Sequence, residues 1–123
     1  MSKQSDLINL SSGDTSVFKT SDTERMRIDS SGNLLVGKTS DSFSTVGSSY
    51  RANGSISATA TANEVLDLNR LSTDGNIMRF FKDGTTVGSI GTPFTGELYI
   101  AASGTNSSGL LLTESNAVRP MKN

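Results

Sequence analysis

One short stretch, residues 24–38, constrains the fold of this chain more than any other, because it predicts a β-hairpin with a single register. Ser30, Ser31 and Gly32 fit a three-residue loop, in which a type I turn is followed by glycine in the left-handed region. Counting outward from the loop brings apolar residues opposite one another, and opposed residues of antiparallel strands share a face. The predicted apolar face of the hairpin pairs Met26 with Val36 and Ile28 with Leu34.

The same stretch carries a resemblance to a known class of proteins. Residues 26–33 read Met-Arg-Ile-Asp-Ser-Ser-Gly-Asn, and with residues 35–37, Leu-Val-Gly, they resemble a segment that recurs in bacteriophage tail fibres and related phage structural proteins. In those proteins the segment often lies upstream of a C-terminal intramolecular chaperone domain, which helps the fibre trimerise and can then cut itself off. Residues 76–91 are similar to fibre sequences of cyanophages and marine phages.

The resemblance implies a location and a set of partners. It implies a virion protein, on the tail or another external appendage, that is assembled in the host cytoplasm. The implied partners are two further copies of the chain in a homotrimer, other phage virion proteins, and a host cell-surface glycan or protein. It identifies neither the host nor the receptor.

The composition gives a single chain few apolar residues with which to build a hydrophobic core. Of its 123 residues only 33% are hydrophobic and 12 are glycine, and there is no cysteine to form disulfides that would replace a core. Partner chains could supply the missing apolar contacts. The net charge of −1 gives no reason to expect nucleic acid as a partner. No run approaches the roughly twenty apolar residues of a membrane-spanning helix, so we expect no membrane insertion.

Short candidate strands, separated by clusters of Ser, Thr, Gly, Asn and Asp, predict an all-β fold of short antiparallel hairpins. The resemblance implies that these hairpins stack as fibre modules. The expected strands outside the two main hairpins are 7–10, 16–19, 55–62, 64–71, 98–102 and 109–113. For residues 55–62 a polar linker is the alternative, and for residues 64–71 it is a short helix. The serine-rich residues 39–53 predict a loop between modules, so we expect domains at 1–50 and 51–123.

A second hairpin is predicted at residues 76–91, because Asp83 and Gly84 suit a type I′ loop. Counting outward from this loop gives both faces of the hairpin large apolar side chains: Phe80 opposite Val87 on one face, and Ile77 opposite Ile90 beside Phe81 on the other. A hairpin with one solvent-exposed face would not place large apolar side chains on both faces. The second face is therefore expected to contact another module or another chain.

The two hairpins together supply the predicted site residues. The expected oligomer interface or core consists of their apolar side chains, namely Met26, Ile28, Leu34, Val36, Ile77, Phe80, Phe81, Val87 and Ile90. Gly32 and Gly84 are expected to be structural turn residues.

Residues that commonly take part in catalysis or metal binding are scarce. Histidine and cysteine are absent, which removes the commonest general base at neutral pH and the commonest metal ligands. Residues 29–33 superficially suggest a calcium loop, but the glycine comes too early and the distal Glu is missing. A glycan-cleaving spike would need two carboxyl groups flanking a glycosidic bond. No spacing pairs the candidates for that role, which are Glu24, Asp67, Glu97 and Glu114. We therefore expect no enzyme, no cofactor and no metal site.

The resemblance to phage fibres implies a virion structural protein, a segment of a phage tail fibre or spike that supports host-surface recognition and adsorption, and the scarcity of core residues agrees with its need for partner chains. Three intertwined or abutting chains would share their apolar faces and leave few free strand edges. One alternative is a passive head-fibre, collar or decoration protein attached to the virion. The other alternative is a glycan-cleaving tailspike.

Overall fold

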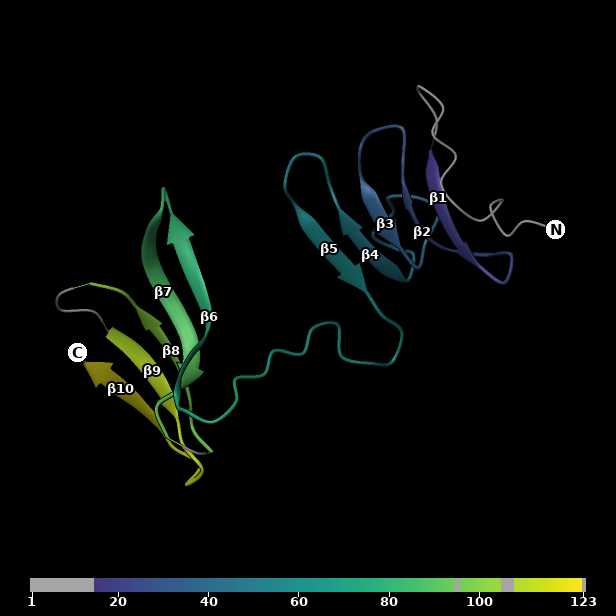
Figure 1. The fold of residues 1–123 in the computed structure, drawn as a ribbon. Helices are drawn as coiled ribbons and strands as arrows, with labels where there is room; N and C mark the ends of the chain where they lie inside the picture. The colour runs from purple at the N-terminus through teal and green to yellow at the C-terminus, as the bar shows by residue number, and fades with distance from the viewer. Residues whose placement is uncertain (1–14, 95, 105–107, 123) are drawn as a thin grey trace. The chain divides into compact units, whose positions relative to one another are not determined.

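The computed structural model describes residues 15–94, 96–104 and 108–122. The chain divides into two units, Met1–Leu66 and Asp67–Asn123, and each unit contains one five-stranded antiparallel sheet (Figure 1). No helix occurs among the described residues, so the predicted all-β fold is confirmed. The candidate strand at residues 7–10 lies outside the described part of the chain.

The N-terminal sheet is a meander in which each strand pairs with the next strand in sequence. Its strands are β1 (Ser16–Thr20), β2 (Thr23–Ile28), β3 (Leu34–Val36), β4 (Gly47–Tyr50) and β5 (Ile56–Thr59). The register predicted for residues 24–38 is confirmed, since Met26 lies opposite Val36 and Ile28 lies opposite Leu34.

The loop between β2 and β3 closes as its sequence predicts. Gly32 has a φ of +80°, and its N–H donates to the carbonyl of Asp29 at 2.9 Å. The Asp29 carboxylate accepts hydrogen bonds from the backbone N–H groups of Ser31 and Asn33, both at 2.9 Å. The Asn33 N–H makes the largest contribution to lowering the pKa of Asp29. A side chain inside the loop therefore fixes its length, and the length fixes the register.

The chain covers one face of this sheet with its own loop. Leu35 and Ser49 lie opposite each other on that face and are completely buried. Residues 37–46, which connect β3 to β4, are tied over the same face: the Thr59 hydroxyl donates to the carbonyl of Phe43 at 2.8 Å, and Arg51 pairs with the Asp41 carboxylate at 2.6 Å. The small core of the unit lies under this loop.

Acid is expected to destabilise this unit. Hydrogen bonds from Arg27, from the Asn33 backbone and from Arg51 lower the pKa values of Glu24, Asp29 and Asp41 respectively. Since folding lowers these pKa values, the stabilisation they provide is complete above the ordinary values of the unfolded chain and is lost as pH falls through the lower folded values. The urea midpoint of unfolding should therefore fall between pH 5 and pH 2, and it should fall less in Asp29→Asn. An equal fall in both proteins would contradict the role given to Asp29.

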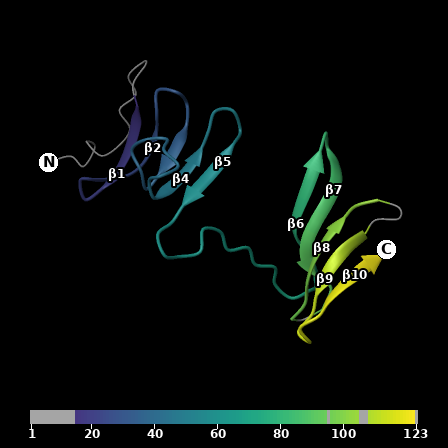
Figure 2. The same ribbon diagram turned by 180° about the vertical axis from the view of Figure 1, so that it is seen from behind.

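The C-terminal sheet is a second meander (Figure 2). Its strands are β6 (Gly75–Lys82), β7 (Thr85–Thr92), β8 (Leu98–Ala102), β9 (Ser108–Leu112) and β10 (Val118–Lys122). The pair β8 and β9 corresponds to the predicted strands at 98–102 and 109–113. Strand β10 was not predicted, and it lies at the edge of the sheet, where Pro120 is tolerated because an edge strand needs hydrogen bonds on one side only.

The register predicted for the β6–β7 hairpin is correct only near its turn. Asp83 and Gly84 have φ values of +49° and +78°, as a type I′ loop requires. An irregularity at Phe80 and Phe81 then shifts the pairing, so that Phe80 lies opposite Gly88 instead of Val87.

The shifted register changes the faces of that hairpin. Met78, instead of Ile77, lies opposite Ile90, because the shift that begins between Phe80 and Phe81 continues as far as Met78. A second irregularity, between Asn76 and Met78, leaves Ile77 unpaired and restores the counted register beyond it. Met78, Phe80 and Ile90 therefore share one face. The predicted pairs Phe80–Val87 and Ile77–Ile90 are therefore wrong, because each bulge inserts one unpaired residue and inverts the alternation beyond it.

The boundary between the units also differs from the prediction. Residues 39–53 are not a loop between modules, because they contain β4, which pairs with both β3 and β5. The chain divides after Leu66 instead of after residue 50. Residues 64–71, predicted to form a strand or a short helix, form neither. They lie exposed between β5 and β6 even though they include Val65, Leu66, Leu68 and Leu71.

Candidate interaction surface

The C-terminal sheet presents one continuous apolar face to solvent within its own unit. Opposed residues share a face, so the strand registers define this surface, which we name the C-terminal apolar face. Its central row crosses all the strands of the sheet: Met78, Ile90, Ile100, Leu110 and Pro120. A flanking row contains Leu98, Leu112 and Val118, and Phe80 lies on the other side. Ile100, at the centre, is 49% exposed and Leu110 is 53% exposed.

The opposite face of this sheet, which we name the polar face, carries polar and small side chains together with Leu111, Met121 and the Tyr99 ring. Arg79, Ser89, Ala101, Gly109 and Met121 form one row across it. The Tyr99 hydroxyl donates to the Asn76 side chain on this face. The two faces of the sheet therefore differ in their rows: the central row of the C-terminal apolar face has no polar side chain, whereas the rows of the polar face include Arg79 and Ser89.

The N-terminal sheet has an apolar face of its own, on the side away from the buried Leu35. This N-terminal apolar face consists of Phe18, Met26, Ile28, Leu34, Val36, Tyr50, Ile56 and Ala58, together with Ser16 and Ser48. Ile28 is 45% exposed and Ile56 is 68% exposed. Unlike the C-terminal apolar face, this surface includes hydroxyl groups near its centre.

Both faces have about the area of the largest apolar patch on a typical soluble monomer, and such patches are often functional. Soluble monomers rarely expose contiguous apolar patches above a few hundred Å² unless a patch binds something. Strands about 4.8 Å apart, with about five residues each at about 3.3 Å, give a five-stranded sheet a face of roughly 400 Å². Each sheet is a single layer, whereas stable architectures pack a second layer against an apolar face. The two faces are therefore the leading candidates for interaction sites.

The predicted site residues fall into three groups. Met26, Ile28, Leu34 and Val36 lie together on the N-terminal apolar face, and Phe80 and Ile90 lie on the C-terminal one. Phe81 lies on the polar face of β6, where the Arg79 guanidinium is 5.1 Å from the centre of its ring. Ile77 and Val87 occupy the two irregularities of the β6–β7 hairpin.

Sequence reasoning missed most of the C-terminal apolar face, namely Met78, Leu98, Ile100, Leu110, Leu112, Val118 and Pro120. A signal was present in part, since Leu98, Ile100 and Ala102 alternate with period two, as do Leu110 and Leu112. Joining those alternations into one surface requires the registers of four strand pairs. One of those registers cannot be counted from the sequence, because the β6–β7 hairpin contains bulges.

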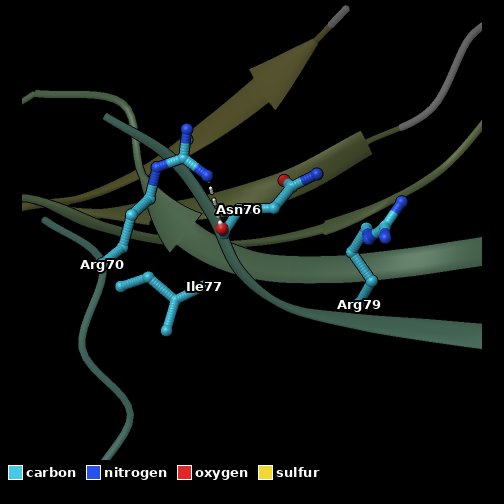
Figure 3. Close-up of a pocket in the computed structure, with 5 residues that line it drawn as sticks. Arg70, Asn76, Ile77 and Arg79 are labelled. Carbon is cyan, nitrogen blue, oxygen red and sulfur yellow. Dashed lines mark hydrogen bonds between the residues drawn. The ribbon is translucent and has the colours of Figure 1, made fainter. Parts of the chain in front are cut away.

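A hollow of 620 Å³ beside β6 is the main alternative site, and it is lined by Arg70, Gly75, Asn76, Ile77 and Arg79 (Figure 3). The Arg70 guanidinium is already engaged there. It donates to the carbonyl of Thr73 at 2.8 Å, to the Thr73 hydroxyl at 3.0 Å and to the carbonyl of Asn76 at 3.2 Å. These bonds tie the entry of β6 in place, so Arg70 has a structural role that accounts for its position.

The described residues offer little for catalysis or metal binding. Among them, no three Asp or Glu side chains gather as metal ligands would. Glu24 forms an ion pair with Arg27 at 2.5 Å, which engages one of the carboxylates considered for glycan cleavage. No helix in the described part of the chain is long and apolar enough to cross a membrane.

Comparison with known proteins gives no relative. No protein-family model matches the chain, and neither a curated protein nor a solved structure matches it.

Proposed function

We propose that this chain is a virion structural protein, a segment of a phage tail fibre or spike that supports host-surface recognition and adsorption. The observation that carries the structural part of the proposal is the C-terminal apolar face, which a single unit leaves uncovered. The phage part rests on the resemblance of residues 26–37 and 76–91 to fibre segments. A chain built as single-layer sheets suits an assembly of several chains better than a catalyst or a carrier of small molecules.

The proposed assembly is a homotrimer. The resemblance to fibres favours three-fold symmetry over the two-fold symmetry that is commonest among soluble oligomers. Partners outside the trimer are other virion proteins and a glycan or protein of the host surface. Several weak contacts on one particle would strengthen adsorption by about a hundredfold or more through linkage. The proposal includes no catalytic, cofactor or metal role.

Sedimentation tests the trimer. The purified chain should sediment as three copies at micromolar concentration, and its thermal midpoint should rise with protein concentration, because mass action favours a folded oligomer over unfolded monomers. A folded monomer with a concentration-independent midpoint would overturn the self-association. A dimer would overturn the three-fold symmetry alone.

Antibody labelling of virions tests the location. Label on the tail fibres or spikes is the expected result. Label on the head or collar would favour a passive head-fibre, collar or decoration protein instead. Incubation with host polysaccharide, followed by an assay for new reducing ends, tests the alternative of a glycan-cleaving spike, and release of such ends would overturn the non-catalytic role.

A further inference from the structure

We infer that the C-terminal apolar face packs against the same face of the other copies of this chain, so that like faces meet around the symmetry axis of the assembly. The inference deepens the self-association within the proposed function and rests on that part alone, so it holds whether the assembly belongs to a tail, a head or a collar. It names the surface at which the copies meet and the chemistry of what covers that surface.

The first argument is the chemistry of the face itself. The side chains of its central row, from Met78 to Pro120, contain no hydrogen-bonding N–H or O–H group. A partner surface with hydroxyls or charges would lose water on burial and gain no bond in return, at a cost in free energy for each polar group. The best-matched partner is therefore a surface made of hydrocarbon alone.

The second argument decides which of the two apolar faces of the chain is the better partner surface. The N-terminal apolar face carries the Ser16 and Ser48 hydroxyls and the Tyr50 phenol, which would be left without partners against the C-terminal face. A second copy of the C-terminal face is purely apolar in its central row and is present wherever the chain is present. Contact between two C-terminal faces thus leaves no polar group of their central rows without a hydrogen bond. In contact between two N-terminal faces, the hydroxyls can form hydrogen bonds with one another.

The third argument is area. One C-terminal face offers roughly 400 Å² of sheet, whereas a standard stable interface buries about 800 Å² on each partner. The two apolar faces of one chain together reach that size. Contact between like faces in both units would therefore reach the size of a standard interface, whereas contact in one unit alone would fall short of it.

Single-cysteine labelling tests the inference, because the chain has no cysteine of its own. In Ile100→Cys the thiol would lie at the centre of the face, at a side chain that is 49% exposed in the single chain. In the matched control, Arg119→Cys, the thiol would lie on β10 facing the other side, at an exposed position. Leu110→Cys, also on the face, serves if Ile100→Cys does not fold. Each protein is treated with a maleimide dye in native buffer and in urea, and its oligomeric state is measured by sedimentation.

The expected result is that Ile100→Cys reacts about tenfold or more slowly than Arg119→Cys in native buffer, since a covered thiol reacts only during local opening, and equally fast in urea. The labelling-resistant species should contain only copies of this chain. Equal native rates in an oligomer would overturn the inference while leaving the self-association intact. Protection in a monomer would mean that the chain covers its own face, and protection by a different co-purifying protein would mean a foreign partner; either result would overturn it.

Discussion

Ile100→Asp is expected to dissociate the assembly, with a rise of at least about a hundredfold in the dissociation constant, equivalent to about 2.7 kcal/mol. Ile100 lies at the centre of the C-terminal apolar face, opposite Ile90 on one side and Leu110 on the other. A carboxylate there would be buried among hydrocarbon groups without a partner, which costs several kcal/mol. Symmetry would also bring the carboxylates of several copies close together.

The matched control for this prediction is Arg119→Asp. It places the same carboxylate on the neighbouring part of the sheet but on the opposite, exposed face. Sedimentation across a range of concentrations should show the control assembled and the Ile100 variant dissociated, with circular dichroism reporting whether the dissociated chains keep their strands. A fully assembled Ile100→Asp protein would show that the face meets water.

The prediction differs from the one that the sequence alone suggests. Counting from the Asp83-Gly84 turn makes Phe81 the interface residue, whereas in the structure its ring packs beside Arg79 on the polar face. The count holds at Phe81 itself and fails further from the turn, where two residues of the hairpin bulge out of the pairing. Bulges depend on the twist and the neighbours of a sheet, so a count along one hairpin cannot locate them.

The hairpin at residues 24–38 was predictable for the opposite reason. Its loop is short, its glycine has a single suitable position, and the Asp29 carboxylate binds the loop backbone locally. All the interactions that fix this register lie within a few residues of one another. Local chemistry of this kind can be read from sequence without knowledge of the remaining fold.

Strands β4 and β10 show what local reasoning leaves out. β4 reads Gly-Ser-Ser-Tyr, a polar sequence typical of a loop, yet it pairs on both sides in the N-terminal sheet. β10 contains Pro120, which argues against a strand in a sheet interior but not at an edge. In both cases the neighbouring strands decide the conformation, so tertiary context overrides propensity.

The low hydrophobic content also has a structural explanation. A sheet that is covered on one face by a loop or left polar needs apolar side chains at only half of its positions. Among the described residues Leu35 is the one buried hydrophobic side chain, while ten of the nineteen exposed large apolar residues lie on the two apolar faces. The exposed apolar side chains on these two faces are therefore placed to pack against a second layer, which a single unit does not contain.

Gly32→Val is expected to destabilise the N-terminal sheet by about 1–3 kcal/mol, because a β-branched residue is strained at positive φ. Gly32 has a φ of +80°, and a Cβ added there would lie 3.5 Å from the Ala52 Cβ, which is an ordinary contact. The expected cost therefore comes from backbone strain and not from crowding. Urea unfolding at fixed protein concentration measures it.

Gly32→Asn separates strain from any other effect of losing the glycine. Asparagine enters the left-handed region far more readily than valine, so its variant should lose much less stability. Equal losses in the two variants would point away from the positive φ, and a wild-type midpoint for Gly32→Val would refute the loop conformation.

The loop also determines the register of β3. A slip of one residue in β3 would move Leu34 and Val36 to the buried side of the sheet and expose Leu35. The Asp-Ser-Ser-Gly loop thus determines which side chains the N-terminal apolar face presents to another chain.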